Sequence, residues 1–449
     1  MIQGLNSLPM ATDVEGIVFS LGSERGGGDG EVRASTAGLI ESFQDQLSAL
    51  VLQINAALAA DTARLKAVWL ITFGAQAALR TADEVRLDQA PALGLWRSLR
   101  QEYPHLWVGS VDLNANNGGQ ASTCAGIVLC ERDEAELALV DSQIFVPRLR
   151  RAPALHSSPK LRPLGLYLVC GGVSGLGLLM AEHLVALGAR EVVLVGRQRP
   201  KQSAEKRIQE MREHGATIHL RNLDVSDAAE INSLIEELSR SSHLAGIVHC
   251  AGTIADGIVE HLTWPHLKQA LMPKAVGTWN LHQAMLAHGV HLDFFILFSS
   301  STSLLGDAGQ GSHAAACAFL DEFASFRAAQ GLTCSSVHWG AWSESGYFVE
   351  HPDQIRTLHE DSSNSISNLE GLSAFETILA TLPTRIAVLP NDWRGFKLAR
   401  KLESSRYLSE LESVSTVVRT REGEQSDVPV MIASASDTDR VALLDKHLL

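Results

Sequence analysis

The chain has 449 residues, of which 45% are hydrophobic and 20% are charged, values typical of a soluble globular protein with two to three domains. Its formal net charge of -14 argues against a nucleic-acid partner, because phosphates attract basic surfaces. No apolar run could span a bilayer and the first residues lack the features of a secretion signal, so we expect no membrane contact. Six cysteines without CxxC pairs favour buried thiols in a reducing cytoplasm over disulfides or zinc ligands.

Strand and helix patterns alternate through the first part of the chain. Residues 1–15 have no clear periodicity and are predicted to be a linker. Strands are then predicted at 16–21, 67–74 and 107–113, helices at 37–61 and 90–104, and a closing segment at 142–151. This alternation implies a parallel sheet that helices cover on both faces. No glycine fingerprint follows these strands, so the unit at 16–151 is expected to be an α/β domain that binds no cofactor.

Two glycine- or proline-rich stretches interrupt this pattern. The run of glycines at 26–28 lacks the lysine and serine of a phosphate-binding loop and has acidic neighbours, which favours a flexible surface loop. Three prolines within 152–165 mark a boundary, after which the α/β alternation begins again and continues to residue 402. The polar segment from 403 onward is typical of a linker, and 440–449 has helical spacing.

The segment 166–200 combines a strand, a glycine turn, a helix and a second strand. Gly171, Gly175 and Gly177 follow the spacing TGxxxGxG, with Cys170 where threonine is usual. Glycines allow a tight turn and close backbone approach, and the helix N-terminus offers free N–H groups to a pyrophosphate. The turn provides the candidate cofactor-binding residues Gly171, Gly172, Ser174, Gly175, Leu176 and Gly177.

Three later strands add candidates for the same cofactor. Arg197 ends the second strand where an NAD-binding fold carries an acid, and an arginine there favours the 2′-phosphate of NADP. Asp224 and Val225 follow the third strand at a place suited to the adenine. Cys250, Ala251 and Gly252 form a small-residue turn after the fourth strand. We therefore predict an NADPH-binding Rossmann-like subdomain.

The motifs GGVSGLG, VLVGR, LDVSD, HCAG, MPKAVGTWNL, FILFSSSTSLLG, GQGSHAAACAFLDEF and VHWGAW, in this order, resemble the ketoreductase domains of modular polyketide synthases. These domains are short-chain dehydrogenases/reductases. The resemblance implies two Rossmann-like subdomains: a truncated, cofactor-free structural one at 16–151 and a catalytic NADPH-binding one at 166–402. It also implies an upstream domain before the linker at 1–15, and the start of an acyl carrier domain within 403–449.

The resemblance places four catalytic positions in this chain. Lys274 stands at the lysine position and Ser300 at the serine position. The family reads NYAAANAF where this chain reads SHAAACAF, so His313 stands at the tyrosine position and Cys317 at the asparagine position. In such ketoreductases the serine and tyrosine hold the ketone oxygen, the tyrosine supplies the proton, and NADPH supplies the hydride.

The two exchanged side chains predict slow or absent reduction. Imidazole donates a full proton only when it is charged, and the neighbouring Lys274 would lower the pKa of His313. Cys317 is a poor hydrogen-bond partner and cannot replace an amide. Loss of one oxyanion donor typically costs about 10²–10³ in rate, and here proton delivery is impaired as well.

Three functions remain open from the sequence: a reductively inactive structural domain, an active reductase that uses His313 as its acid, and a non-redox epimerase at the α-carbon. The partner implied by the resemblance is an acyl carrier protein with a phosphopantetheine-bound acyl chain, beside neighbouring polyketide synthase domains. No further cysteine or histidine pair has ligand spacing, so we expect no metal site.

Overall fold

The computed structural model describes residues 16–22, 35–61, 65–114, 120–131, 133–153, 159–162, 164–241, 243–346, 365–390, 406–412 and 430–433. The predicted linker at 1–15, the glycine run at 26–28 and the predicted helix at 440–449 lie outside these residues. Within the part of the chain that the structure describes, no helix is both long and apolar enough to cross a membrane.

The chain folds into two compact units that do not follow the sequence order. The first comprises Met1–Pro147, Thr253–Val276 and Thr302–Gly331, and the second comprises Arg148–Gly252, Gly277–Ser301 and Leu332–Leu449. Two segments from the second part of the sequence therefore belong to the unit of the N-terminal sheet. The predicted subdomains at 16–151 and 166–402 are continuous in sequence. The compact units are not, because residues 253–276 and 302–331 belong to the same unit as residues 1–147.

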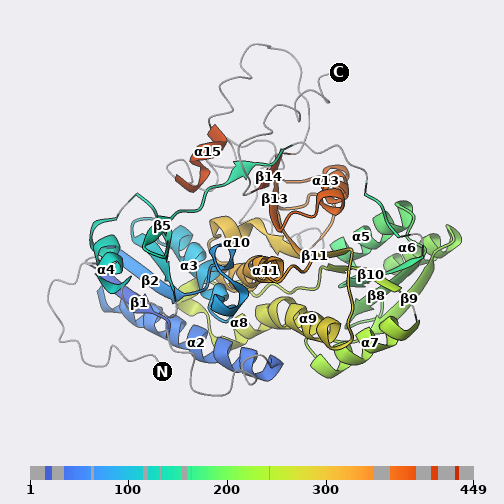
Figure 1. Ribbon diagram of the computed structural model, residues 1–449, viewed down its shortest axis with the longest axis horizontal. Helices are drawn as coiled ribbons and strands as arrows, with labels where there is room; N and C mark the ends of the chain where they lie inside the picture. The colour runs from blue at the N-terminus through green and yellow to red at the C-terminus, as the bar shows by residue number, and fades with distance from the viewer. Residues whose placement is uncertain are drawn as a thin grey trace, which may run out of the picture. The chain divides into compact units, whose positions relative to one another are not determined.

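The first unit contains a five-stranded sheet in the order β1-β2-β3-β4-β5 (Figure 1). Its strands are β1 (Gly16–Ser20), β2 (Ala67–Phe73), β3 (Trp107–Leu113), β4 (Glu136–Val140) and β5 (Gln143–Phe145). The first four are parallel, and β5 pairs antiparallel with β4. The helices of its N-terminal part are α2 (Thr36–Asp61), α3 (Ala90–Glu102) and α4 (Ala121–Cys130). The predicted helices at 37–61 and 90–104 and the three predicted strands are confirmed.

Helices cover both faces of this sheet. On one face, the side chains of Trp69, Val111 and Leu139 pack against Cys124 and Ile127 of α4 in one apolar cluster. On the other face lies α3, whose buried Trp96 donates its indole N–H to the carbonyl of Gly109 over 2.7 Å. Burial of both faces explains the nearly continuous apolar runs that predicted the strands.

The second unit contains a nine-stranded sheet in the order β6-β14-β13-β12-β11-β10-β7-β8-β9. Its parallel strands are β7 (Gly165–Cys170), β8 (Glu191–Gly196), β9 (Thr217–Asn222), β10 (His243–His249), β11 (Phe294–Ser300), β12 (Ser335–Trp339) and β13 (Arg385–Leu389). The strand order reverses at β7, where β8 lies on one side and β10 on the other. In open α/β sheets this reversal is where ligands bind, outside the carboxyl ends of the strands.

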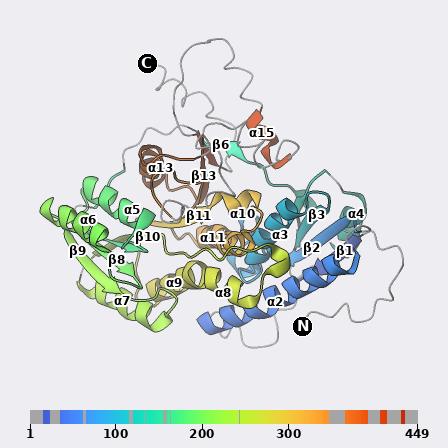
Figure 2. The ribbon, with the colours of Figure 1, turned by 180° about the vertical axis from the view of Figure 1, so that it is seen from behind.

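Helices from the connections cover this second sheet on both faces. They are α5 (Gly175–Ala186), α6 (Gln202–Glu213), α7 (Ala228–Ser241), α9 (Gly277–Ala287) and α13 (Asn368–Thr381). Both views show α5 and α6 on one side of β8 and β10, and α7 and α9 on the other (Figures 1 and 2). The predicted fold class, α/β with two Rossmann-like subdomains and parallel sheets, is confirmed.

Two segments differ from the sequence predictions. The closing segment at 142–151 divides between the sheets, because β6 (Arg150–Arg151) follows Pro147 and joins the nine-stranded sheet. Within the predicted linker at 403–449, β14 (Val430–Ala433) pairs antiparallel with β13 and with β6. The backbone N–H and C=O groups of β14 pair with the edge of β13, which explains why this short stretch is a strand.

Candidate active site

In the glycine turn after β7, the backbone lies very close both to the turn at 250–252 and to the first turn of α5. Gly171 has a φ of +80°, and a Cβ on it would lie 2.8 Å from the amide nitrogen of Ala251. A Cβ on Gly177 would lie 2.1 Å from the carbonyl oxygen of Gly171. Only glycine fits at these two positions, so the first turn of α5 can lie directly against the loop. The structure thus brings the glycine turn and the turn at 250–252 together.

The other predicted cofactor residues lie at the same carboxyl edge of the second sheet. Arg197 directly follows β8, with a side chain that is 61% exposed, and its guanidinium lies 4.0 Å from the carboxylate of Asp224. Asp224 accepts hydrogen bonds from the backbone and hydroxyl of Ser226, which fixes the turn after β9. Ser300 is the last residue of β11, at that same edge.

One residue of this edge was missed by the sequence reasoning. Asn280 of α9 is buried and donates its side-chain N–H to the carbonyl of Val225 over 3.0 Å. Next to it, a Cβ on Gly277 would lie 2.8 Å from the side chain of Val225. These contacts hold the loop after β9 against the start of α9. The motif GTWNL contains both residues, but its spacing alone does not indicate which loop they contact.

Cys170 is a buried thiol at the end of β7. Its side chain is fully buried, and this burial raises the pKa of the thiol to about 12. The thiol therefore stays protonated and fills space beneath the glycine turn. All six cysteines are free; Cys130 is exposed and Cys250 is partly exposed, while the other four are buried.

The other three residues predicted to be catalytic, Lys274, His313 and Cys317, belong to the first compact unit. Lys274 is buried in a π-helical turn, Met272–Val276, between α8 (Trp264–Leu271) and α9. His313 is the third residue of α11 (Gly311–Ala329) and is partly buried. Burial, and to a smaller extent the positive charge of Lys274, lower the pKa of His313 to about 3. The direction agrees with the sequence prediction, but burial is the larger cause.

His313 and Cys317 face one another across one turn of α11. The thiol sulfur lies 3.6 Å from Nε2 of the imidazole, and Nδ1 of the same ring is buried without a hydrogen-bond partner. Cys317 is fully buried. The pair therefore presents a neutral imidazole and a shielded thiol at the two positions that the sequence resemblance assigns to a tyrosine and an asparagine.

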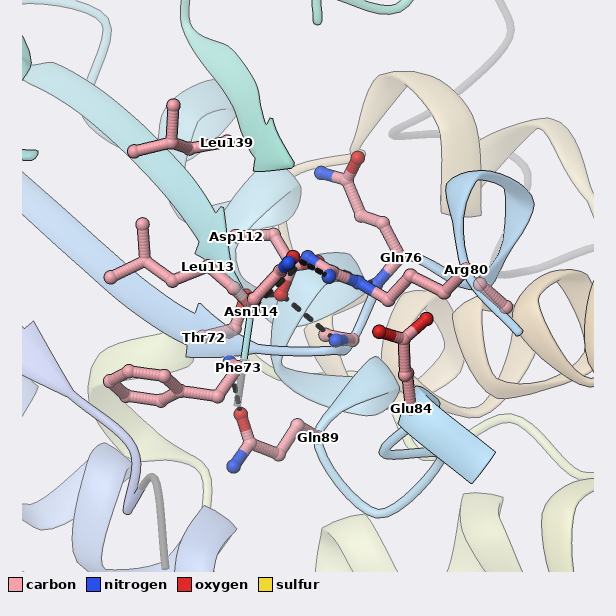
Figure 3. A network of polar contacts seen from close by, with 12 residues as sticks. Thr72, Phe73, Gln76, Arg80, Glu84, Gln89, Asp112, Leu113, Asn114 and Leu139 are labelled. Atoms are coloured by element: carbon pink, nitrogen blue, oxygen red, sulfur yellow. Dashed lines mark hydrogen bonds and ion pairs between the residues drawn. The ribbon is translucent and has the colours of Figure 1, made fainter. Parts of the chain in front are cut away.

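In the first unit, the side chain of Asp112 is hydrogen-bonded to the residues that follow the carboxyl end of β2 (Figure 3). The buried carboxylate of Asp112 accepts the backbone N–H groups of Ala75 and Gln76 over 2.9 and 3.2 Å. It also accepts the hydroxyl of Thr72 over 2.7 Å and forms an ion pair of 2.7 Å with Arg80. Two N–H groups that could receive an anion at this edge are thus already satisfied internally.

Comparison with known proteins extends over both halves of the chain. The KR domain family matches residues 165–344, and the Rossmann fold domain of the polyketide synthase extender module SpnB matches residues 11–149. The solved structure of an A-type ketoreductase from a modular polyketide synthase is 30% identical, with a TM-score of 0.74, and covers 83% of this chain and 79% of that chain. The ketoreductase from the first module of phoslactomycin biosynthesis in Streptomyces sp. HK803 is 27% identical, with a TM-score of 0.73, and covers 89% and 87%.

The curated relatives are much longer proteins. Polyketide synthase GfsB of Streptomyces halstedii is 36% identical over 318 residues, which are 69% of this chain and 6% of that protein. A mycocerosic acid synthase-like polyketide synthase of Mycolicibacterium smegmatis is 35% identical over 242 residues, which are 53% of this chain and 11% of that protein. The chain spans 6%, 9% and 3% of the first three curated relatives that it matches.

The strand order, the glycine turn and the candidate residues at the carboxyl edge define a Rossmann-like domain of the short-chain dehydrogenase/reductase type. Together with these matches, they show that the chain belongs to the ketoreductase domains of polyketide synthases. The family resemblance drawn from the sequence motifs is confirmed.

Proposed function

We propose that this chain is a ketoreductase-fold domain that reduces carrier-bound β-ketoacyl thioesters slowly or not at all. The observation that carries the proposal is the neutral imidazole of His313 at the position of the family's tyrosine. With a pKa of about 3, only about one imidazole in 10⁴ carries a donatable second proton at pH 7. Cys317 cannot supply the hydrogen bonds of the amide that the family has there.

We further propose that the second unit binds NADPH, which would supply the hydride in the family reaction. The fit rests on the glycine turn. A side chain on Gly177 would collide with the loop at Gly171, and a side chain on Gly171 would collide with the turn at 250–252. The turn would hold the pyrophosphate at the N-terminus of α5, and the exposed Arg197 would hold the 2′-phosphate. Asp224 and Val225 would lie at the adenine, and Cys250, Ala251 and Gly252 at the nicotinamide side.

The proposed partners are an acyl carrier protein with a phosphopantetheine-bound acyl chain and the neighbouring domains of a polyketide synthase. The length of the curated relatives supports neighbouring domains, because this chain matches only a small part of each. The predicted start of a carrier domain within 403–449 remains a prediction, because most of that segment lies outside the described residues.

Two measurements on the purified chain test the proposal. NADPH binding is followed by fluorescence titration, and reduction is followed by NADPH absorbance with a β-ketoacyl thioester. We expect saturable binding with little or no reduction. Reduction at a rate comparable to an active ketoreductase would instead support the use of His313 as the acid.

An epimerase is tested by the loss of deuterium from an α-methyl β-keto thioester. A general base needs a pKa near the operating pH, and a pKa of about 3 makes the imidazole of His313 a weak base. We therefore expect no loss of deuterium above the rate without protein. Loss that depends on His313 would replace the proposal by a non-redox epimerase.

A further inference from the structure

The N-terminal helix α3 bonds to the segment that leads into α11. Side chains from its last two turns are hydrogen-bonded to every second residue of that segment, at positions 303, 305, 307 and 309. Arg97 donates to the carbonyl of Ser303 over 2.6 Å, and Gln101 donates to the carbonyl of Leu305 over 3.0 Å. These contacts join residues about two hundred positions apart in the sequence, within the same compact unit.

The same segment approaches α3 closely at one glycine. Gly306 has a φ of +73°, and a Cβ on it would lie 2.1 Å from the carbonyl oxygen of Arg97. The next residue, Asp307, donates its backbone N–H to the hydroxyl of Ser98 over 3.4 Å. Only glycine fits here, so the segment runs directly along α3.

Glu102, the last residue of α3, binds two separate backbone segments with its two carboxylate oxygens. One oxygen accepts the N–H of Gly309 over 2.9 Å, and the other accepts the N–H of Val259 over 2.8 Å. The two segments also bond to each other, because the N–H of Gly257 donates to the carbonyl of Gly309 over 2.8 Å. Hydrogen bonds to a charged acceptor are among the stronger ones in proteins.

The first turn of α11 follows this junction directly. Ser312 donates its hydroxyl to the carbonyl of Ala255 over 2.5 Å, which ties the helix to the segment 255–259 once more. His313 is the next residue. The backbone that carries His313 therefore begins beside a junction in which the carboxylate of Glu102 binds both the segment 255–259 and the turn at 306–310.

We propose that Glu102 is a positioning residue that fixes the turn at 306–310 to the segment 255–259 and thereby sets the first turn of α11. That this turn carries a reaction centre rests on the function proposed above. The junction itself does not depend on that function, because it consists of contacts within one compact unit.

Hydrogen exchange of the full chain, read by mass spectrometry, tests the junction directly. In Glu102→Ala, peptides that contain Val259 and Gly309 should exchange about tenfold faster or more, because two bonds to a charged acceptor are lost. Glu102→Gln keeps one acceptor oxygen and should restore part of the protection. The matched control is Glu260→Gln, since Glu260 accepts the hydroxyl of Tyr103 and no backbone N–H of the junction.

The outcomes separate a local role from a general one. Faster exchange confined to 255–262 and 306–313 supports the proposal. It is overturned if Glu102→Ala leaves either segment unchanged, if Glu260→Gln has the same effect, or if exchange also rises in the core of β7 and β8.

A second readout uses His313→Tyr with Cys317→Asn as a background that should reduce ketones. There, Glu102→Ala should lower kcat about tenfold or more while the KM for NADPH stays the same. An unchanged kcat overturns the positioning role. If the background itself does not reduce ketones, His313 and Cys317 are not the sole cause of the slow reduction proposed above, and hydrogen exchange still decides the role of Glu102.

Discussion

The sharpest prediction concerns the double substitution His313→Tyr with Cys317→Asn, which should restore reduction. A phenol with a pKa near 10 is fully protonated at pH 7, whereas the imidazole of His313 with a pKa of about 3 is almost fully neutral. The four pH units between 3 and 7 correspond to about 10⁴ in the population of the proton donor, or about 5.5 kcal/mol. A neutral N–H can still hydrogen-bond an oxyanion, so we expect the rate to rise by about 10²–10⁴.

The assay is NADPH oxidation with a β-ketoacyl thioester, at saturating cofactor. His313→Phe with Cys317→Asn is the matched control, because phenylalanine fills the same space as tyrosine without a hydroxyl group. The control should stay as slow as the unchanged protein. In the tyrosine variant, Ser300→Ala should remove most of the gained activity, because the family's serine shares the ketone oxygen with the tyrosine.

The pH profile gives an independent check with a defined sign. Any residual reduction that uses the charged imidazole of His313 should rise about tenfold for each unit of decreasing pH between 7 and 4, since the pKa of His313 lies at about 3. The tyrosine variant should not share this rise. The reasoning is refuted if the unchanged protein already reduces as fast as the tyrosine variant, or if the phenylalanine control gains equally.

Three further predictions concern cofactor choice and stability. Arg197→Ala should weaken NADPH binding about tenfold and leave NADH binding unchanged in fluorescence titrations, because only NADPH carries the 2′-phosphate. Asp112→Asn should lower the free energy of unfolding in urea by about 3–5 kcal/mol, because it leaves the buried Arg80 without its ion-pair partner. Gly94→Ala places a Cβ 2.1 Å from the carbonyl oxygen of Ala314 and should cost about 1–3 kcal/mol. The matched control is Gly126→Ala, where no atom lies within 4 Å and where alanine should stabilise α4 by about 0.5–1 kcal/mol.

Each of these three predictions can be contradicted by a specific result. Equal weakening of NADH binding would place Arg197 away from the 2′-phosphate. If the free energy of unfolding of Asp112→Asn lies within about 1 kcal/mol of the unchanged protein, the ion pair between Asp112 and Arg80 is replaceable. That margin is about the effect of a typical single mutation. Tolerance of Gly94→Ala equal to that of Gly126→Ala would show that α3 and α11 can separate.

The sequence predicted the elements that are buried and periodic. The strand at 67–74 and the helix at 37–61 were recognised because their apolar residues repeat with the right spacing. The helix α4 was missed because its small and apolar residues give no clear face, and β14 was missed because four residues within a polar stretch carry little signal. Packing against the five-stranded sheet stabilises α4, and pairing with β13 stabilises β14.

The candidate site was predictable where a local motif determines it. The glycine turn, with Gly171 and Gly177, follows from the glycine spacing together with the predicted strand before it and the helix after it. The direction of the His313 pKa followed from Lys274, but the larger contribution of burial required the packing around α11. The junction at Glu102 could not be predicted, because it joins α3 to segments of the chain more than 150 positions away.

The close packing of α3 against α11 affects how such a domain can be exchanged between synthases. A graft that begins at residue 166 would carry α11 and leave behind the helix to which its preceding segment is hydrogen-bonded. The four acceptors and donors along 303–309 would then face water or a foreign helix with different side chains. A transferable unit therefore has to start upstream of α3, so that the helix and its bonded segment move together.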